Sequence, residues 1–332
     1  MHQNRPRISI FTTCKNGGEY LRDSLDSIFK QTFQDFEVVL VDGVSTDNTI
    51  EILKEYEKDS RLRWISEKDS DANEGFYKAL MMCRGKYVMC LPISDVYLSK
   101  TWFQKCVNIL DNDTEVSLVF GATSNLDEDG TLRDVTFPDW FKKPLPVKRD
   151  FLPFWLATFC FITELTYCVR KNVYLECFPS YRQKPSFYKT NKLLTNAEFD
   201  VHGPFLKFIY NFNIKGYLSY FLPLQATGGR NHQASRNNSF GDYLKYESQK
   251  FTGDIVEFRE KLAKGDINFS FKDGNSNIIQ TLTKKDIVVM SRKIIKYRIY
   301  GNIMFNYKDK LNIKNYFAPL KRVLMRIKEY IF

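Results

Sequence analysis

The sequence predicts an α/β fold in which a mostly parallel sheet is flanked by helices. Over the first 125 residues, short apolar runs rich in β-branched side chains alternate with segments whose apolar residues recur every three or four positions. Parallel strands need a crossover connection, which such a helical segment supplies. Apolar residues make up 43% of the 332-residue chain and aromatic residues 15%, so we expect a packed globule rather than a disordered chain.

Five strands and four helices are expected in this part of the chain. Strand signals fall at residues 7–13, 37–41, 62–65, 86–91 and 116–122. Helical spacing is found at residues 21–29, around Ile52, Leu53 and Tyr56, at residues 73–83, and after Ser99, which we expect to be an N-cap. In parallel sheets ligands bind beyond the carboxyl ends of the strands, so the loops that follow the strands should carry the chemistry.

The pattern changes after residue 125. Residues 127–130 (Asp-Glu-Asp-Gly) predict a tight turn, and residues 137–187 are aromatic and punctuated by proline, without a clean period. A helix is expected within residues 196–210, and residues 228–233 have the composition of a loop. We divide the chain into a body, residues 1–240, with halves at 1–124 and 125–240, and a basic, largely helical extension, residues 241–332.

The net charge of +10 lies entirely in the last part of the chain. Residues 284–332 hold 13 Lys and Arg against 3 Asp and Glu, so residues 1–283 carry 36 charges of each sign and are neutral. No recognition motif accompanies this charge, and we expect no nucleic-acid partner.

Residues 317–332 predict a basic amphipathic helix. Its apolar residues, at 317, 320, 324, 327 and 331, form one stripe on a helical wheel, with Arg322 and Arg326 nearly opposite. Such a helix either lies on an anionic membrane surface or packs on the body with its charges in water, and the sequence leaves both alternatives open.

Cysteine usage and hydropathy predict a cytoplasmic protein. Seven cysteines without a C-x-x-C pair indicate neither a disulfide framework nor a zinc ribbon, so we expect reduced, mostly buried thiols. Residues 1–7 lack the apolar core of a signal peptide, and the longest apolar stretch, residues 151–162, is shorter than the ~20 residues that span a bilayer. If the basic helix binds lipid, the protein would be peripheral on the inner face of the cell membrane.

Carboxylates follow the first strands of the expected sheet. Asp42 ends the second strand, where its side chain can accept hydrogen bonds from a nucleotide base or ribose. The alternative is a capped turn, with Ser45 or Thr46 as the N-cap of the next helix and Asp47 in its first turn. The charged run at residues 66–71 follows the third strand and would also suit a solvated loop.

Two further carboxylate segments suit metal binding and acid–base chemistry. Asp95 follows the fourth strand, where it could hold Mg²⁺ or Mn²⁺ against phosphate oxygens. Glu198 and Asp200 precede an expected helix and are candidates for a general base, the alternative being acidic residues placed at a helix N-terminus. The sequence has no Walker A loop, G-x-G-x-x-G, G-x-S-x-G or H-E-x-x-H motif, which argues against phosphate-loop NTPases, dinucleotide oxidoreductases, α/β-hydrolases and zincins.

Taken together, these segments resemble the family 2 glycosyltransferases, which have the GT-A fold. The resemblance is strongest over residues 8–56, where a strand, an N-G pair, an L-x₃-L-x-S-I-x₂-Q-T helix and a V-D-G-x-S-T-D-x-T turn occur in order, and it continues more weakly to about residue 240. It implies transfer of a sugar from a nucleotide diphosphosugar, with a UDP-sugar favoured, to a hydroxyl of a glycan or lipid-linked acceptor. It also implies inversion at the anomeric carbon and a role in cell-surface polysaccharide synthesis.

The resemblance assigns roles to ten residues of this chain. Donor binding falls to Thr13, Asp42, Asp69, Lys78, Ser94 and Arg230, metal binding to Asp95 and His232, and the general base to Glu198 or Asp200. Arg230, His232 and Ser235 are similar to an R-x-H-x-x-S pattern found late in many GT-A domains.

The chain departs from the family pattern at the metal motif. The usual pair of aspartates is reduced to Asp95, which follows Pro92, Ile93 and Ser94. In the donor segment, Asp71 and Ala79 replace glycines and Tyr77 replaces an asparagine. A non-catalytic relative that binds nucleotide sugars is therefore the alternative function.

Overall fold

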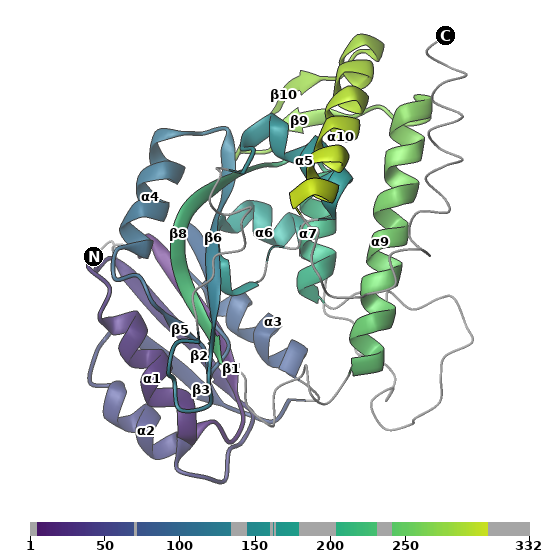
Figure 1. The fold of residues 1–332 in the computed structure, drawn as a ribbon. Helices are drawn as coiled ribbons and strands as arrows, with labels where there is room; N and C mark the ends of the chain where they lie inside the picture. Colours follow the sequence, from purple (N-terminus) through teal and green to yellow (C-terminus); the bar gives the residue numbers. More distant parts are fainter. Residues whose placement is uncertain are drawn as a thin grey trace.

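An eight-stranded sheet forms the centre of the protein, in the order β3-β2-β1-β4-β7-β6-β8-β5 (Figure 1). This computed structural model describes residues 5–69, 72–133, 145–159, 162, 164–178, 204–230 and 241–304. The strands of the sheet are β1 (Ile8–Cys14), β2 (Phe36–Asp42), β3 (Leu62–Ser66), β4 (Tyr87–Cys90), β5 (Val96–Tyr97), β6 (Val116–Leu126), β7 (Tyr167–Arg170) and β8 (Leu218–Arg230).

The first half of the sheet confirms the expected parallel arrangement. Strands β2 and β4 pair with β1, and β3 pairs with β2, all in parallel. The expected helices also form, as α1 (Gly18–Phe29), α2 (Thr49–Tyr56), α3 (Ala72–Met82) and α4 (Trp102–Asn112). One boundary was wrong: α4 begins at Trp102 with Thr101 as the preceding residue, so Ser99 is not its N-cap.

The second half of the sheet is mixed. Strand β7 pairs antiparallel with both β4 and β6, and β5 pairs antiparallel with β8, so three of the seven pairings in the sheet are antiparallel. The expected turn at residues 127–130 is confirmed, because the Gly130 amide donates to the Asp127 carbonyl at 2.9 Å. Residues 228–230 belong to β8, so the loop expected there was a wrong prediction for its first three residues.

Alternating side chains of the central strands supply two hydrophobic cores, one on each face of the sheet. Ile8 and Ile10 of β1 face a core that includes residues of α1, α2 and α4. Phe11 faces the other core, which includes residues of α3, α5 (Phe151–Thr158), α6 (Lys171–Cys177) and α7 (Pro204–Ile214). A strand covered on both faces has few polar positions, which is why β1 and β2 appear in the sequence as continuous apolar runs.

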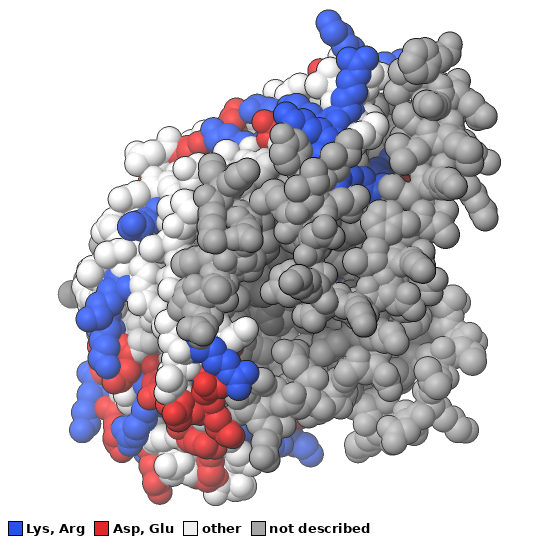
Figure 2. All heavy atoms as spheres, viewed as in Figure 1, with Lys and Arg blue, Asp and Glu red and all other residues white. Residues whose placement is uncertain are grey.

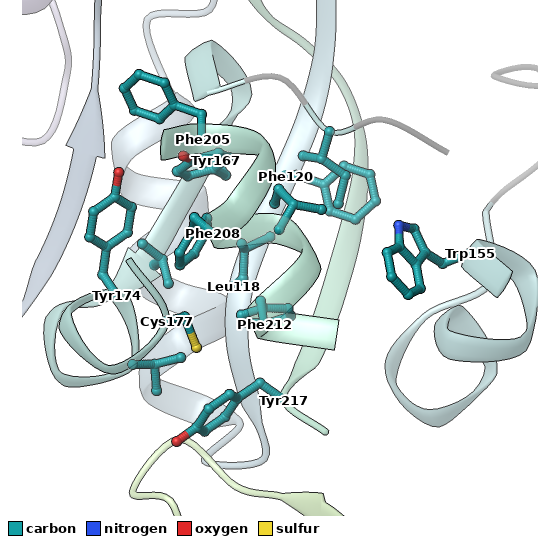
Figure 3. Close-up of a cluster of buried hydrophobic side chains, with 14 of the residues drawn as sticks. Leu118, Phe120, Trp155, Tyr167, Tyr174, Cys177, Phe205, Phe208, Phe212 and Tyr217 are labelled. Carbon is teal, nitrogen blue, oxygen red and sulfur yellow. The ribbon is translucent and has the colours of Figure 1, made fainter. Parts of the chain in front are cut away.

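The second core is built largely from aromatic rings (Figure 3). The rings of Tyr174 in α6 and Phe208 in α7 lie 4.5 Å apart between centroids, and Tyr167 of β7 lies 5.4 Å from Phe208. Aromatic pairs at these separations contribute about 0.5–1.5 kcal/mol beyond the area they bury. The aromatic segment without a clean period is therefore core-forming over its described part.

The part of the chain after residue 240 packs on the same aromatic core. It comprises α9 (Gly241–Lys264), a hairpin of β9 (Ser270–Lys272) and β10 (Ile278–Thr281), and α10 (Lys284–Met304). Phe251 and Ile255 of α9 and Ile294 of α10 are buried members of that core. The expected helix at residues 317–332 lies outside the described residues.

Lys and Arg side chains gather along the top of the molecule in Figure 2, where Figure 1 places α10, and Asp and Glu side chains gather in the region of α1 and α2.

Among the described residues, no helix combines the length and the apolar character needed to cross a membrane. The described cysteines are free and buried, as expected (Cys14, Cys83, Cys90, Cys106, Cys168 and Cys177).

The buried carboxylate of Glu37 joins β2 to neighbouring segments near the amino-terminal end of the strand, opposite to the end that carries Asp42. Glu37 is 2% exposed, and its carboxylate accepts hydrogen bonds from Ser9 Oγ at 2.7 Å, the Arg84 amide at 2.6 Å and Arg63 at 2.8 Å. Burial alone would raise the pKa of Glu37, but the hydrogen bonds from Ser9, Arg84 and Arg63 outweigh it and leave the pKa below its usual value.

This pKa shift predicts an acid-dependent contribution to stability. A carboxylate whose pKa is lower in the folded state stabilises the protein above the pKa of the unfolded chain, about 4.3, and the stabilisation is lost as pH falls through the folded-state pKa. Glu37→Gln should therefore lower the free energy of unfolding by about 1–3 kcal/mol at pH 7. In urea unfolding curves, variant and wild type should converge towards pH 3.

Glu55→Gln is the matched control. Glu55 is also paired with an arginine, Arg22, but both side chains are about half exposed, at 52% and 49%. Exposed ion pairs contribute little to the free energy of unfolding, so Glu55→Gln should unfold with the same free energy as the wild type at pH 7 and at pH 3. A difference between Glu37→Gln and the wild type that persists undiminished at pH 3 would contradict the role given to the ionised carboxylate.

Candidate active site

The carboxyl ends of β1, β2 and β3 bring three polar side chains to one edge of the sheet. In the strand register Thr13 lies opposite Val41, Cys14 opposite Asp42, and Asp42 opposite Ser66. Thr13 Oγ1 donates to the Val41 carbonyl at 2.9 Å, which uses its proton and leaves both lone pairs of the hydroxyl as acceptors. This is the edge at which ligands bind in open α/β sheets.

Asp42 is fully buried, and its carboxylate is surrounded by donors. It accepts hydrogen bonds from the Ser45 amide at 3.0 Å, Ser66 Oγ at 2.7 Å and Ser45 Oγ. These bonds compensate the loss of hydration that a buried carboxylate suffers. They also hold the carboxylate in one orientation at the end of β2.

The loop after Asp42 is joined to the loop after β1, an arrangement that the sequence did not indicate. The Asn16 amide donates to Ser45 Oγ at 2.7 Å, and Asn16 Oδ1 accepts from the Thr46 amide at 2.8 Å. Asp47 accepts from the amides of Gly18 and Thr49, each at 3.0 Å. The alternative of a turn capped by Ser45 or Thr46 is therefore wrong: α2 begins at Thr49, and Asp47 precedes the helix and joins it to the start of α1.

Asp69 reaches the same edge from the loop after β3. Its Oδ2 lies 3.0 Å from the position that a Cβ on Gly43 would occupy. A Cβ on Gly75 of α3 would overlap Thr13 Oγ1 and lie 3.1 Å from Asp69 Oδ2. The structure thus brings Thr13, Asp42 and Asp69 together around the start of α3.

Lys78 binds the charged loop to α3. Its ammonium pairs with Glu67 at 2.7 Å and with Glu74 at 3.2 Å. The hydrogen bond from Lys78 to Glu67 is the main reason why the pKa of Lys78 is raised. In this conformation Lys78 orders the loop that carries Asp69.

Asp95 lies in a buried bend between β4 and β5 that α1 holds in place. Ser94 has a positive φ of 130°, and its amide donates to Ser24 Oγ at 3.3 Å. The hydroxyl of Ser24 donates in turn to the Asp95 carbonyl at 2.8 Å. Asp95 is 8% exposed, and its Oδ1 accepts the Arg230 amide at 2.8 Å.

Three polar residues on one face of α1 and just beyond it have a positioning role that the sequence analysis did not assign. Besides Ser24, Ser27 Oγ accepts the Tyr97 amide at 3.0 Å. Gln31 donates to the Ser99 carbonyl at 2.9 Å and accepts the Phe103 amide at 3.3 Å. The available signal was a polar stripe at positions 24, 27 and 31 on the buried face of an amphipathic helix.

Arg230 joins the end of β8 to this bend. Its side chain is 5% exposed, pairs with Asp23 at 2.7 Å, lies over the ring of Tyr20 at 4.8 Å and donates to the Glu128 carbonyl at 3.3 Å. The contact between Asp95 and the Arg230 main chain brings together two predicted site residues that are 135 positions apart. Glu198, Asp200 and His232, the remaining candidates, lie outside the described residues.

The described residues fit a divalent cation only in partnership with a ligand. They contain no cluster of three His, Cys, Asp or Glu side chains that could hold a metal by themselves. Mg²⁺ commonly takes one or two carboxylates together with substrate phosphates. Asp95 provides one carboxylate that could bind Mg²⁺ in this way, together with the phosphates of a substrate.

Comparison with known proteins decides the family. Residues 9–172 match the family described as Glycosyl transferase family 2. This part of the chain is a family 2 glycosyltransferase domain. Thr13, Asp42, Asp69, Lys78, Ser94 and Asp95 all lie within this glycosyltransferase domain, whereas Arg230 lies beyond it.

Relatives of the glycosyltransferase domain include the chondroitin synthase of Escherichia coli, 32% identical over 128 residues, or 38% of this chain and 18% of that protein. The putative teichuronic acid biosynthesis glycosyltransferase TuaG of Bacillus subtilis is 31% identical over 132 residues, 39% of this chain and 52% of that protein. The chain therefore spans about half or less of the length of these curated relatives.

Solved structures confirm the fold. The chain resembles residues 1–349 of S. aureus TarS, solved in complex with UDP-GlcNAc, with a TM-score of 0.52 and 17% identity. The likeness covers 93% of this chain and 77% of that one, so it extends past the glycosyltransferase domain into the part built on β8, α9 and α10.

Proposed function

We propose that the protein transfers a sugar from a nucleotide diphosphosugar, with UDP as the favoured nucleotide, to a hydroxyl of a glycan or lipid-linked acceptor in cell-surface polysaccharide synthesis. The observation that carries this proposal is the meeting of Thr13, Asp42 and Asp69 at the carboxyl edge of β1–β3, inside the family 2 domain. The names of the relatives support it, since they include a chondroitin synthase and a putative teichuronic acid biosynthesis glycosyltransferase, and the TarS structure holds UDP-GlcNAc.

In this proposal the donor lies across the edge of the sheet. Asp42, Asp69 and Thr13 accept hydrogen bonds from the nucleoside, and the diphosphate extends towards Ser94 and Asp95. A carboxylate already held by protein donors needs little reorganisation when a ligand binds, which favours affinity. Mg²⁺ or Mn²⁺ held by Asp95 and the diphosphate would neutralise charge on the leaving group.

The transfer itself is a displacement with inversion at the anomeric carbon. The acceptor oxygen forms a bond to that carbon as the bond to the diphosphate breaks, and the hydroxyl proton passes to a carboxylate, Glu198 or Asp200. The nucleotide diphosphate leaves with the electron pair of the broken bond.

A thermal-shift screen tests donor binding. Nucleotide sugars with different bases should be compared with and without Mn²⁺, because a ligand that binds only the folded state raises Tm. Asp42→Asn replaces an acceptor oxygen with a donor amide and should weaken binding of the preferred donor at least about tenfold in apparent Kd. Asp273→Asn is the control, since Asp273 also accepts main-chain amides, from Asn275 and Asn277, but lies in the β9–β10 turn.

A second candidate, a non-catalytic protein that binds nucleotide sugars, is favoured by one observation. The single carboxylate of the metal segment, Asp95, already accepts the Arg230 amide through Oδ1. Release of nucleotide diphosphate separates the candidates. A donor that raises Tm but is not turned over with Mn²⁺ and any acceptor glycan would favour the non-catalytic protein, whereas an absence of any nucleotide-dependent shift would contradict both.

A further inference from the structure

Asp23 and Ser24, two neighbouring residues of α1, are linked to Asp95 from two directions. Ser24 binds the main chain of the bend, through the Ser94 amide at 3.3 Å and the Asp95 carbonyl at 2.8 Å. Asp23 is linked to the carboxylate of Asp95 through Arg230: it binds the Arg230 guanidinium at 2.7 Å, and the Arg230 main-chain N–H donates to Asp95 Oδ1 at 2.8 Å. A single turn of α1 therefore contacts both the backbone that carries Asp95 and the residue that donates to its side chain.

The guanidinium of Arg230 lies between α1 and the turn that follows β6. Besides Asp23, it contacts the ring of Tyr20 in α1 at 4.8 Å from the ring centroid, and it donates to the Glu128 carbonyl in the turn at 3.3 Å. The turn fits closely around it, since a Cβ on Gly130 would lie 3.1 Å from Arg230 Nη2. These contacts hold the side chain at its far end and so restrain the end of β8 relative to α1.

This ion pair differs from an ordinary surface ion pair. The Arg230 side chain is 5% exposed, although that of Asp23 is 56% exposed. Exposed ion pairs with no further connection contribute little, whereas groups that orient a metal ligand commonly change metal affinity by about 10–100-fold. The hydrogen bond from the Arg230 main chain restricts rotation of the Asp95 carboxylate, the group that would bind a cation together with the diphosphate.

We propose that Asp23 and Arg230 are positioning residues whose ion pair sets the affinity of the Asp95 site for a divalent cation. The inference rests on the proposed binding of a nucleotide diphosphosugar with Mg²⁺ or Mn²⁺. Asp23 holds the Arg230 side chain on α1, and the Arg230 main chain orients Asp95. Breaking the ion pair frees the end of β8, so the carboxylate is less well preorganised when the cation and the diphosphate arrive.

The test measures Mn²⁺ binding rather than turnover. The full chain is titrated with MnCl₂ at a fixed, saturating concentration of UDP, and the rise in Tm gives the Mn²⁺ concentration at half-saturation. Asp23→Asn and Arg230→Gln should each raise that concentration about tenfold and leave the response to UDP without Mn²⁺ unchanged. The double variant should bind Mn²⁺ no more weakly than either single variant, because both substitutions break the same link. Since Asp23 is about half exposed, Asp23→Asn should keep the wild-type Tm in the absence of ligands.

The two substitutions separate positioning from a simple effect of charge. Asp23→Asn removes a negative charge, which by itself weakens the binding of a cation, but Arg230→Gln removes a positive charge, which by itself strengthens it. Positioning predicts weaker binding in both variants. Asp26→Asn is the matched control, because Asp26 lies one turn further along α1 and pairs with the exposed Lys30 at 2.8 Å. It removes the same charge as Asp23→Asn and should keep the wild-type affinity for Mn²⁺.

Three results would overturn the inference and leave the proposed function intact. They are unchanged or tighter Mn²⁺ binding by Arg230→Gln, equal weakening in Asp23→Asn and Asp26→Asn, and weaker binding of UDP to Arg230→Gln without Mn²⁺, which would assign the guanidinium to the donor instead. A wild type whose response to UDP does not depend on Mn²⁺ would contradict the metal site of the proposed function, and this inference with it.

Discussion

Asp95→Asn should lower the metal-dependent release of nucleotide diphosphate by about 10²–10³-fold or more. The substituted side chain keeps a carbonyl oxygen, which can accept the hydrogen bond that the Arg230 main-chain N–H donates to Asp95 Oδ1 at 2.8 Å in the wild type. The bend between β4 and β5 should therefore survive. The negative charge that would hold Mg²⁺ or Mn²⁺ against the diphosphate is lost, and losing one preorganised electrostatic contact to a leaving group has an effect of this size.

The measurement is steady-state nucleotide release at several Mn²⁺ concentrations, with Tm measured in parallel. Asp273→Asn serves again as the control and should retain wild-type rates. If Asp95→Asn retains activity within about threefold at every metal concentration, Asp95 does not hold the metal. If activity and Tm fall together, the carboxylate matters for the bend rather than for the metal.

Gly216→Ala should be among the most destabilising single substitutions in the described chain. Gly216 has φ +81° where α7 ends and β8 begins, a conformation that costs a residue with a Cβ about 1–2 kcal/mol. The new Cβ would also overlap the carbonyl oxygen of Ser270 and lie 3.2 Å from Cα of Phe271, which are backbone atoms of β9. We expect a loss of about 3 kcal/mol or more and a fall in Tm of about 6–12 °C.

Two other glycines separate the causes of this effect. Gly265, just after α9, has φ +76° but no atom within 4 Å of the position that a Cβ would occupy, so Gly265→Ala should show only the cost of the backbone conformation. Gly253 lies inside α9 with neither a positive φ nor a neighbour within 4 Å, so Gly253→Ala should stabilise slightly through helix propensity. Urea unfolding should rank the losses in the order Gly216, Gly265, Gly253, and equal losses at Gly216 and Gly265 would contradict the clash with β9.

The parallel part of the sheet could be predicted because its signals are local. Each strand from β1 to β4 is a short run with a strong apolar content, and the connecting α1, α2 and α3 each carry their own apolar period. Asp42 could be placed at the edge for the same reason, because a polar residue at the end of an apolar run marks the carboxyl end of a strand, here with its side chain still buried.

Strand β8 was not predicted, because its residue composition favours a loop and only its pairing with β6 makes it a strand. Its sequence, LSYFLPLQATGGR, contains a proline and two glycines, which favour loops in isolation. The β6–β8 register shifts at three points, so an irregular strand is accommodated where a regular ladder would exclude it. Pairing with β6 over the length of the strand is a property of the folded sheet and leaves no local signal.

The sequence by itself determined the α/β class, the family 2 resemblance and the positions of Thr13, Asp42 and Asp95 near strand ends, because each depends on residues close together in the chain. Only the tertiary structure decided that the Arg230 main-chain amide donates to Asp95 and that α1 holds the bend around Ser94. Such contacts join distant segments, and several use main-chain amides and carbonyls. Every residue except proline has both groups, so no residue type in the sequence marks which of them will meet.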